Sequence, residues 1–222
     1  MRTVITCEHA SSDIPARLLP EARKCFGSDA LQSHVAYDLF AGQAAMHLSQ
    51  KLGARCFMGN WSRLCIDLNR SLRNPAVWSK LSHSMTETEK ENWRNYHRTY
   101  RQEVQTSIKT HFNRGCILHI SVHSFTPLWN GERRSCDVGL LYDPRKAKEK
   151  NLALKLQKYL QDGGWKVRRN YPYRGDADGF TTALRKIYPD DRYLGLELEL
   201  NQSLGPGMLK VVDLLVGELK NL

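Results

Sequence analysis

Short hydrophobic runs alternate along this chain with longer segments whose apolar residues recur every three to four positions. The short runs predict buried strands, and the longer spacing predicts helices that pack against them. Strands are expected at Val4–Cys7, Arg55–Met58, Leu64–Leu68, Cys116–Val122, Val138–Tyr142, Trp165–Arg169 and Tyr193–Leu200. Helices are expected at Ser28–Leu52, from Thr86 to about Phe112, at Ala147–Leu160, within Asp176–Ile187 and at Met208–Asn221.

The ends of two predicted helices carry recognisable signals. Thr86 and Glu89 have the spacing of a capping box, which starts the longest helix. Ser28 is a suitable N-cap for another helix, and Gly53 is a suitable residue just beyond its C-terminus. Because strands and helices alternate without a linker or a repeat, we predict one α/β domain over residues 1–222 with a mostly parallel central sheet.

The composition is that of an ordinary globular protein, with 41% hydrophobic and 25% charged residues among 222. No apolar run approaches the roughly 18 residues of a membrane span. The run after Met1 becomes polar at Glu8, so it predicts a strand and not a signal peptide. The six cysteines include no CxxC pair, which disfavours a thiolate zinc site and suits a reducing compartment. These features predict a cytoplasmic protein.

Lysine and arginine number 33 against 23 aspartates and glutamates, giving a net charge of +10. Such a surplus permits contact with nucleic acid. The positive residues are spread along the chain, however, and the sequence contains no nucleic-acid-binding motif. An anionic small molecule explains the charge equally well, with Arg133, Arg134 and Arg174 adding positive charge around its binding site.

Polar side chains follow or end several predicted strands, where ligands bind in open α/β sheets. The pairs Glu8-His9, Asn69-Arg70 and His123-Ser124 each come after a strand, and the last strand contains Glu197 and Glu199. Two histidines on neighbouring strand ends suit a zinc site, in which a carboxylate is a common third ligand. The residues alone leave Glu8, Asp13 and Asp38 open as that ligand.

The remaining polar residues suggest amide hydrolysis. Glu197 and Glu199 share one strand face, and Glu199, nearer the strand end, is our preferred general base. The alternative is that both glutamates line the solvent face of an edge strand. Arg63 is suited to polarising a carbonyl, and Asn69 with Arg70 to binding a substrate carboxylate. A rival nucleophile, Cys7 with His9 as its base, is disfavoured because buried cysteines are usually inert.

Seven segments make the chain resemble the N-formylglutamate amidohydrolase family. They are Thr6–Ser11 followed by Ile14-Pro15, Tyr37-Asp38, Ser62–Arg70, His123-Ser124-Phe125-Thr126-Pro127, Asp137–Tyr142, Asn170–Tyr173 and Glu197–Asn201. The resemblance implies a three-layer α/β sandwich similar to the zinc carboxypeptidases, with a mixed central sheet and one zinc ion per chain. It implies His9 and His123 as metal ligands, Arg63 and Glu199 as catalytic residues, and Asn69 and Arg70 as the carboxylate clamp.

The chain departs from carboxypeptidase-type sites, which take two ligands from a His-x-x-Glu motif. Ser12 stands where that glutamate is expected, three residues after His9. We assign Asp38 as the third ligand because the family pattern has an aspartate there, with Glu8 and Asp13 as alternatives. Ser124 and Arg133 complete the predicted substrate-binding set.

We therefore predict a zinc-dependent hydrolase that cleaves the amide of an N-formyl or N-acyl acidic amino acid, such as N-formylglutamate. Its expected partner is a small carboxylate, with neither nucleic acid nor membrane involved. One alternative is a carboxypeptidase-like metallohydrolase acting on a small peptide or cell-wall fragment. The other is a non-catalytic protein that binds an anion or nucleic acid through its basic surface.

Overall fold

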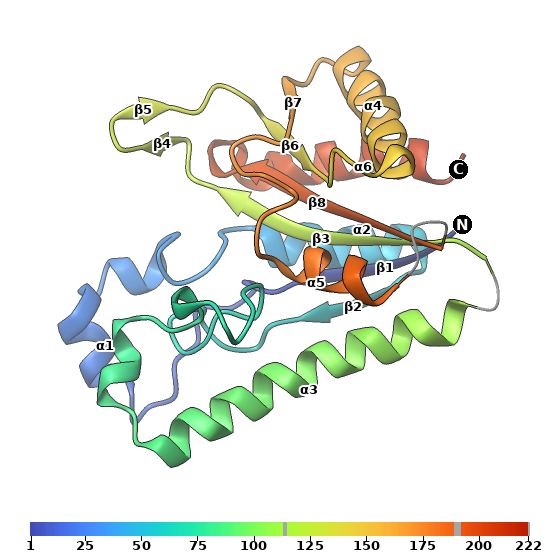
Figure 1. The fold of residues 1–222 in the computed structure, drawn as a ribbon. Helices are drawn as coiled ribbons and strands as arrows, with labels where there is room; N and C mark the ends of the chain where they lie inside the picture. The colour runs from blue at the N-terminus through green and yellow to red at the C-terminus, as the bar shows by residue number, and fades with distance from the viewer. Residues whose placement is uncertain (113–114, 189–191, 222) are drawn as a thin grey trace.

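Six strands form one mixed sheet in this computed structural model, which describes residues 1–112, 115–188 and 192–221 (Figure 1). The sheet order is β2-β1-β3-β8-β6-β7. The strands β1, β2, β3 and β8 run parallel, while β6 is antiparallel to β8 and parallel to β7. Their bounds are β1 Arg2–Cys7, β2 Arg55–Met58, β3 Ile117–Phe125, β6 Val138–Leu141, β7 Val167–Arg169 and β8 Tyr193–Asn201.

Helices cover both faces of this sheet, because successive strand residues point to opposite sides. Ile5 and Cys7 pack into a core with α2 (Ala41–Leu52), α4 (Ala147–Asp162) and α6 (Met208–Leu219). Val4 packs into a second core with α1 (Leu19–Phe26), α3 (Glu87–His111) and α5 (Phe180–Ile187). The predicted α/β fold with a mostly parallel, helix-flanked sheet is therefore confirmed.

The long helix α3 forms as its sequence predicts. Thr86 Oγ1 accepts a hydrogen bond from the Glu89 amide at 3.3 Å, and the Glu89 carboxylate accepts one from the Thr86 amide at 2.8 Å. Its buried positions, including Trp93, Tyr100 and Val104, recur at helical spacing and face the sheet. This helix spans the face of the molecule shown at the bottom of Figure 1.

The prediction of one helix over Ser28–Leu52 is wrong in its first half. A 3-10 turn occupies Ala30–Gln32, and α2 begins only at Ala41. Phe40 adopts a left-handed conformation with φ 64°, and the Asp38 amide donates to the His9 carbonyl at 2.9 Å. These two features interrupt any continuous helix, so Asp38 lies in a loop and not on a helix.

The strand predicted at Leu64–Leu68 is also wrong. Its backbone bonds are local or reach another loop: the Cys65 amide donates to Ser62 and the Asp67 amide donates to Val77. The side chains are buried as expected, with Leu64, Ile66 and Leu68 in the second core. Asn69 and Arg70 therefore project from a buried loop and not from a strand end.

The helix α1 and a small hairpin were not anticipated. The hairpin consists of β4 (Leu128–Trp129) and β5 (Glu132–Arg133) and extends beyond the carboxyl end of β3 (Figure 1). Further 3-10 helices lie at Pro75–Val77, Lys80–Ser84 and Gln202–Gly207. Across the described ranges, the helices are all too short or too polar to cross a membrane.

Candidate metal centre and substrate cavity

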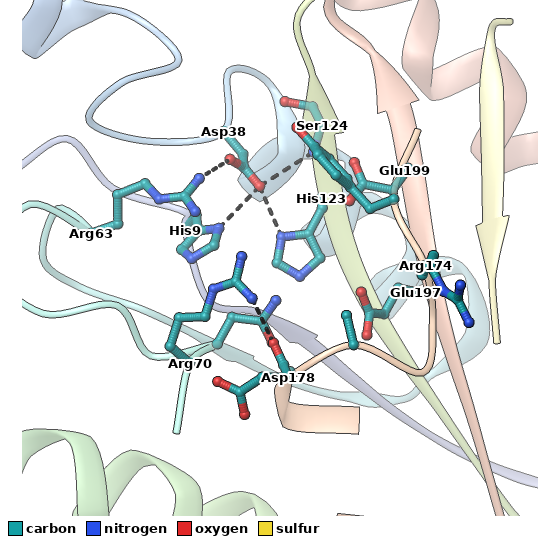
Figure 2. A pocket seen from close by; sticks show the side chains of 14 residues that line it. His9, Asp38, Arg63, Arg70, His123, Ser124, Arg174, Asp178, Glu197 and Glu199 are labelled. Carbon is teal, nitrogen blue, oxygen red and sulfur yellow. Dashed lines mark hydrogen bonds and ion pairs between the residues drawn. The ribbon is translucent and has the colours of Figure 1, made fainter. Parts of the chain in front are cut away.

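A cavity of about 380 Å³ lies at the sheet edge where the parallel strands β1, β3 and β8 end (Figure 2). Residues from distant parts of the chain line it, which the parallel topology makes possible. They are His9, Asp38, Arg63, Asn69, Arg70, His123, Ser124, Tyr173, Arg174, Ala177, Asp178, Gly179, Glu197 and Glu199. Eight of the nine residues predicted for catalysis, substrate binding or metal binding are thus in one place.

Asp38 lies between the two histidines. Its Oδ2 atom is 3.3 Å from His9 Nδ1 and 2.8 Å from His123 Nδ1. One ligand atom from each residue lies within 4.8 Å of the other two, and all three residues are buried. Figure 2 shows the two rings and Arg63 turned toward the Asp38 carboxylate. Two imidazoles and one carboxylate form a donor set that zinc favours, so these residues fit a divalent metal.

A carboxylate also holds the second nitrogen of each imidazole. His9 Nε2 lies 2.7 Å from Asp67 Oδ1, and His123 Nε2 lies 3.2 Å from Glu8 Oε2. Ser121 reinforces the second pair, because its hydroxyl donates to Glu8 Oε2 at 2.6 Å. Metal-binding histidines commonly donate their second N–H to a carboxylate in this way.

The alternative third ligands occupy different positions from Asp38. Glu8 contacts His123 at the nitrogen that points away from Asp38, so it orients the ring. Asp13 is exposed and does not line the cavity in the described part of the chain. Asp38 is therefore the carboxylate that the geometry places with Nδ1 of both rings.

The buried charges stabilise one another. Burial by itself raises the pKa of Asp38, but the neighbouring His9 and His123 outweigh it and hold this pKa well below its usual range. Burial likewise opposes the charged form of His123, while hydrogen bonds to Asp38 and Glu8 raise the pKa of this histidine well above its ordinary value. The arrangement thus concentrates negative charge around two rings, as a cation site requires.

Arg63 lies beside the cluster of His9, Asp38 and His123 and also lines the cavity. Its guanidinium donates to Asp38 Oδ1 at 3.3 Å and to Asp67 Oδ2 at 3.2 Å. These two bonds fix the plane of the guanidinium, and its side chain keeps 29% exposure where it lines the cavity. A fixed positive group beside the candidate metal centre is suited to binding a carbonyl oxygen.

Glu197 and Glu199 share a face of β8 and both line the cavity, as their spacing predicts. The strand β8 lies between β3 and β6, which excludes the edge-strand alternative. Glu199 pairs in register with His123, and its Oε2 is buried with no hydrogen-bond partner among the described residues. Burial raises the pKa of Glu199 to about 8. The Glu197 carboxylate, by contrast, is bonded to the Thr181 hydroxyl.

The Asn69 and Arg70 side chains are held by the segment that precedes and begins α5. Asn69 lines the cavity, and its Oδ1 accepts a hydrogen bond from the Phe180 amide at 2.7 Å, so its amino group is the part of the side chain left to donate to a ligand. Arg70 also lines the cavity, and its Nη1 donates to the Asp178 carbonyl at 2.8 Å. An amide and a guanidinium side by side suit a carboxylate ligand.

Ser124 and Arg133, the other two residues predicted to bind substrate, differ in whether they reach the cavity. Ser124 lines the cavity, but its hydroxyl donates to the Leu39 carbonyl at 2.8 Å and accepts from Gln202 at 3.0 Å. Arg133 is exposed on β5 and does not line the cavity described by residues 1–112, 115–188 and 192–221. Tyr173 and Arg174 occupy the cavity wall instead.

Several contributors were not identified from the sequence as parts of the site. Asp67 and Ser121 orient the histidines, and Thr181 holds Glu197. Asp67 is a charged residue within the otherwise apolar segment Leu64–Leu68, which is the signal that the sequence offers for it. Cys7, the rival nucleophile, is fully buried, and burial, aided by Asp38 and Glu8, raises the pKa of its thiol well above the ordinary value. That disfavours the thiolate.

The fold and the site together define an α/β protein with a candidate His-Asp-His metal centre beside a polar cavity. The sequence profile of the N-formylglutamate amidohydrolase family matches residues 1–205. The chain therefore belongs to this amidohydrolase family, which confirms the resemblance seen in its sequence motifs.

Two solved structures share the fold. A gene product from Agrobacterium tumefaciens superposes with a TM-score of 0.78 at 24% identity, covering 99% of this chain and 90% of that one. An N-formylglutamate amidohydrolase from Ralstonia eutropha gives a TM-score of 0.74 at 18% identity, covering 97% and 91%. A comparison with curated proteins gave no match.

Proposed function

We propose that this protein is a metal-dependent amidohydrolase that cleaves the N-formyl or N-acyl group from an acidic amino acid such as glutamate. The observation that carries the proposal is that Nδ1 of His9 and Nδ1 of His123 both meet Oδ2 of Asp38 in the cavity that Glu199 also lines. The Glu199 Oε2 atom is buried without a hydrogen-bond partner among the described residues. Family membership supports the same reaction class. The metal we propose is zinc, one ion per chain, because two imidazoles and a carboxylate suit it.

A divalent ion held by His9, Asp38 and His123 would supply a Lewis acid that polarises the amide carbonyl and makes water more acidic. Glu199 accepts the proton of the attacking water at its free Oε2 and passes it to the leaving nitrogen. A nearby cation favours the charged form of this carboxylate, whose pKa of about 8 otherwise keeps it protonated at neutral pH.

Arg63 stabilises the negative charge that develops on the carbonyl oxygen as water adds to the carbon. The hydrogen bonds that Arg63 donates to Asp38 and Asp67 hold the guanidinium in place before substrate arrives, so no reorganisation is needed during the reaction. Breaking the C–N bond of N-formylglutamate then releases formate and glutamate. The overall reaction consumes one water molecule, whose oxygen ends in formate and whose proton is transferred to the leaving nitrogen.

Asn69 and Arg70 bind a carboxylate of the substrate through the Asn69 amino group and the Arg70 guanidinium. A cavity of about 380 Å³ is at the small end of ligand pockets, which suits a single amino-acid derivative. Arg70 and Arg174 on the cavity wall favour an acidic class of substrate, because a guanidinium binds a carboxylate well.

The proposal is tested by adding N-formyl-L-glutamate to zinc-loaded protein and measuring formate and glutamate release. We expect turnover that a chelator abolishes and zinc restores, and that His9→Ala abolishes. The matched control is His47→Ala, which removes a histidine from α2 whose ring pairs with Asp213 on the surface. Turnover that survives both chelation and His9→Ala would contradict metal dependence, and ligand binding without turnover would favour a non-catalytic binding protein.

A further inference from the structure

The Arg101 side chain, on α3, bonds to the backbone of the loop that carries Asn69 and Arg70. Its Nε and Nη2 atoms donate to the Leu68 carbonyl at 3.1 and 3.0 Å. The same Nη2 donates to the carbonyls of Asn69 at 3.0 Å and Arg70 at 2.8 Å. One guanidinium therefore binds three consecutive carbonyl groups, which turns them toward α3.

Arg101 also reaches the group that orients the Asn69 amide. Its guanidinium carbon lies 4.7 Å from the centre of the Phe180 ring, a stacking distance. The Phe180 amide donates to Asn69 Oδ1 at 2.7 Å. The main chain of Asn69 and the residue that fixes its side chain thus both contact Arg101.

A second residue of α3 supports the same loop. His97 lies one turn before Arg101, and its Nε2 donates to the Arg70 carbonyl at 2.9 Å. Among the described residues, Arg101 forms no ion pair with a carboxylate, so its three carbonyl contacts are its polar partners. Arg101 is partly buried. Removing a guanidinium from water without a carboxylate partner is costly, and well-placed hydrogen bonds to carbonyl groups offset part of that cost.

From these contacts we propose that Arg101 is a positioning residue for substrate recognition. It holds the 68–70 loop and Phe180 so that Asn69 and Arg70 face the cavity together and bind the substrate carboxylate. The proposal rests on the proposed function, in which these two residues form the carboxylate clamp. A lysine cannot replace Arg101, because one ammonium group lacks the planar fork that reaches three carbonyls and stacks on a ring.

Substrate selectivity distinguishes this positioning role from general stabilisation of the fold. A merely structural residue would lower the thermal midpoint and reduce binding and turnover of all substrates alike. A positioning residue for the clamp instead reduces selectivity for a carboxylate. The ratio of kcat/KM for N-formylglutamate to that for its α- and γ-amides reports this selectivity directly.

The experiment compares wild type with Arg101→Ala, Arg101→Lys, Arg70→Ala and the control Arg98→Ala. Arg98 is an exposed residue of the same helix whose guanidinium contacts only Glu91 and Asn95 among the described residues. The kcat/KM ratio, its KM and kcat components, and the thermal midpoint are measured for each protein. Calorimetry with glutarate, a dicarboxylate without an amide, gives a binding constant that does not depend on turnover.

We expect Arg101→Ala to lose about tenfold in acid-over-amide selectivity, mainly through KM, in the same direction as Arg70→Ala. Glutarate binding by Arg101→Ala should weaken by a similar factor. Arg101→Lys should recover little of the lost selectivity and binding, and Arg98→Ala should match wild type in both. Equal losses on acids and amides, or unchanged glutarate binding in folded Arg101→Ala, would overturn the positioning role. Wild-type protein that binds glutarate but cleaves no substrate would contradict the proposed function and leave the Arg101 test valid through binding.

Discussion

His9 Nε2 lies 2.7 Å from Asp67 Oδ1. This contact fixes the ring so that Nδ1 is the nitrogen directed at Asp38. If His9 binds a metal through Nδ1 as a neutral ring, Nε2 must carry the proton, and the Asp67 carboxylate is the acceptor for it. Asp67 thereby determines which nitrogen is available as a ligand, although it does not line the cavity itself.

Asp67→Asn is expected to lower zinc affinity by about 10–100-fold, the usual effect of losing such a partner. Asparagine keeps an oxygen at the same position but removes the charge that stabilises the ring and Arg63. A competition titration with a chromophoric chelator measures the affinity. Asp178→Asn is the control, since the Asp178 carboxylate accepts hydrogen bonds from Ser71 and Asn74 and, within the described part of the chain, forms no hydrogen bond or ion pair with His9 or His123, the candidate ligand histidines. Unchanged zinc affinity in Asp67→Asn would contradict this role.

Glu199→Gln is expected to reduce turnover by about 10²–10⁴-fold, the share that a general base contributes. The variant should keep its metal, because Glu199 is not one of the three candidate ligands. Glu197→Gln is the matched comparison on the same strand face and should lose less activity, since Thr181 already occupies its carboxylate. If Glu197→Gln were inactive and Glu199→Gln active, the roles of the two glutamates would be reversed.

Gly139→Ala is expected to destabilise the protein by roughly 1–3 kcal/mol, as overpacking of a core does. Gly139 pairs with Glu199 across β6 and β8, and an added methyl group would overlap the Tyr171 carbonyl and lie 3.1 Å from Glu199 Cβ. Activity should fall as well, because Glu199 and the loop carrying Tyr173 would both move. Denaturant unfolding measures the first effect. Gly207→Ala, where the methyl group meets nothing within 4 Å, should keep wild-type stability.

The buried His119 should make the metal-free protein less stable in acid. Burial lowers the pKa of His119 to about 4 from an ordinary value of 6.5, with Arg185 and His123 opposing and Glu8 favouring its charge. Between those pH values the unfolded chain binds a proton that the folded chain excludes, so stability falls as pH decreases from 6.5 toward 4. The loss from pH 7.5 to pH 5 should be about 2 kcal/mol from this group alone.

His119→Gln should flatten that part of the stability curve. Glutamine is neutral throughout and can serve the same partners, the hydroxyls of Thr6 at 2.9 Å and Tyr193 at 2.7 Å. Urea unfolding of metal-free wild type and variant at pH 7.5 and pH 5 gives the comparison. An identical pH dependence in the two proteins would exclude His119 as a source of the acid sensitivity.

The parts of the fold that the sequence predicted are those with strong local signals. The capping box at Thr86 and the helical spacing behind it located α3, and the apolar runs located β1, β2, β3, β6 and β8. The prediction of a strand at Leu64–Leu68 was wrong because burial gives a packed loop the same apolar pattern as a strand. What distinguishes them is the backbone partner, here Val77 and not a strand, which periodicity does not reveal.

The same limit applies to the site. His9, His123 and Glu199 were identified because residues that end or lie near the ends of parallel strands meet at one edge. Asp67, Ser121 and Arg101 act through other side chains or through carbonyl groups, and no residue spacing indicates such contacts in advance. Asp38 was identified from the family resemblance, yet its loop position depends on the left-handed Phe40, for which the sequence carries no glycine signal.

The metal content of the purified protein tests the central claim most directly. Elemental mass spectrometry of wild type, of the His9→Ala/His123→Ala double variant and of His47→Ala gives the number of ions per chain. The His-Asp-His site predicts about one zinc ion per chain in wild type and in His47→Ala, and almost none in the double variant. Wild-type protein that takes up no metal on reconstitution, or a double variant that keeps it, would contradict the metal centre and the hydrolytic function built on it.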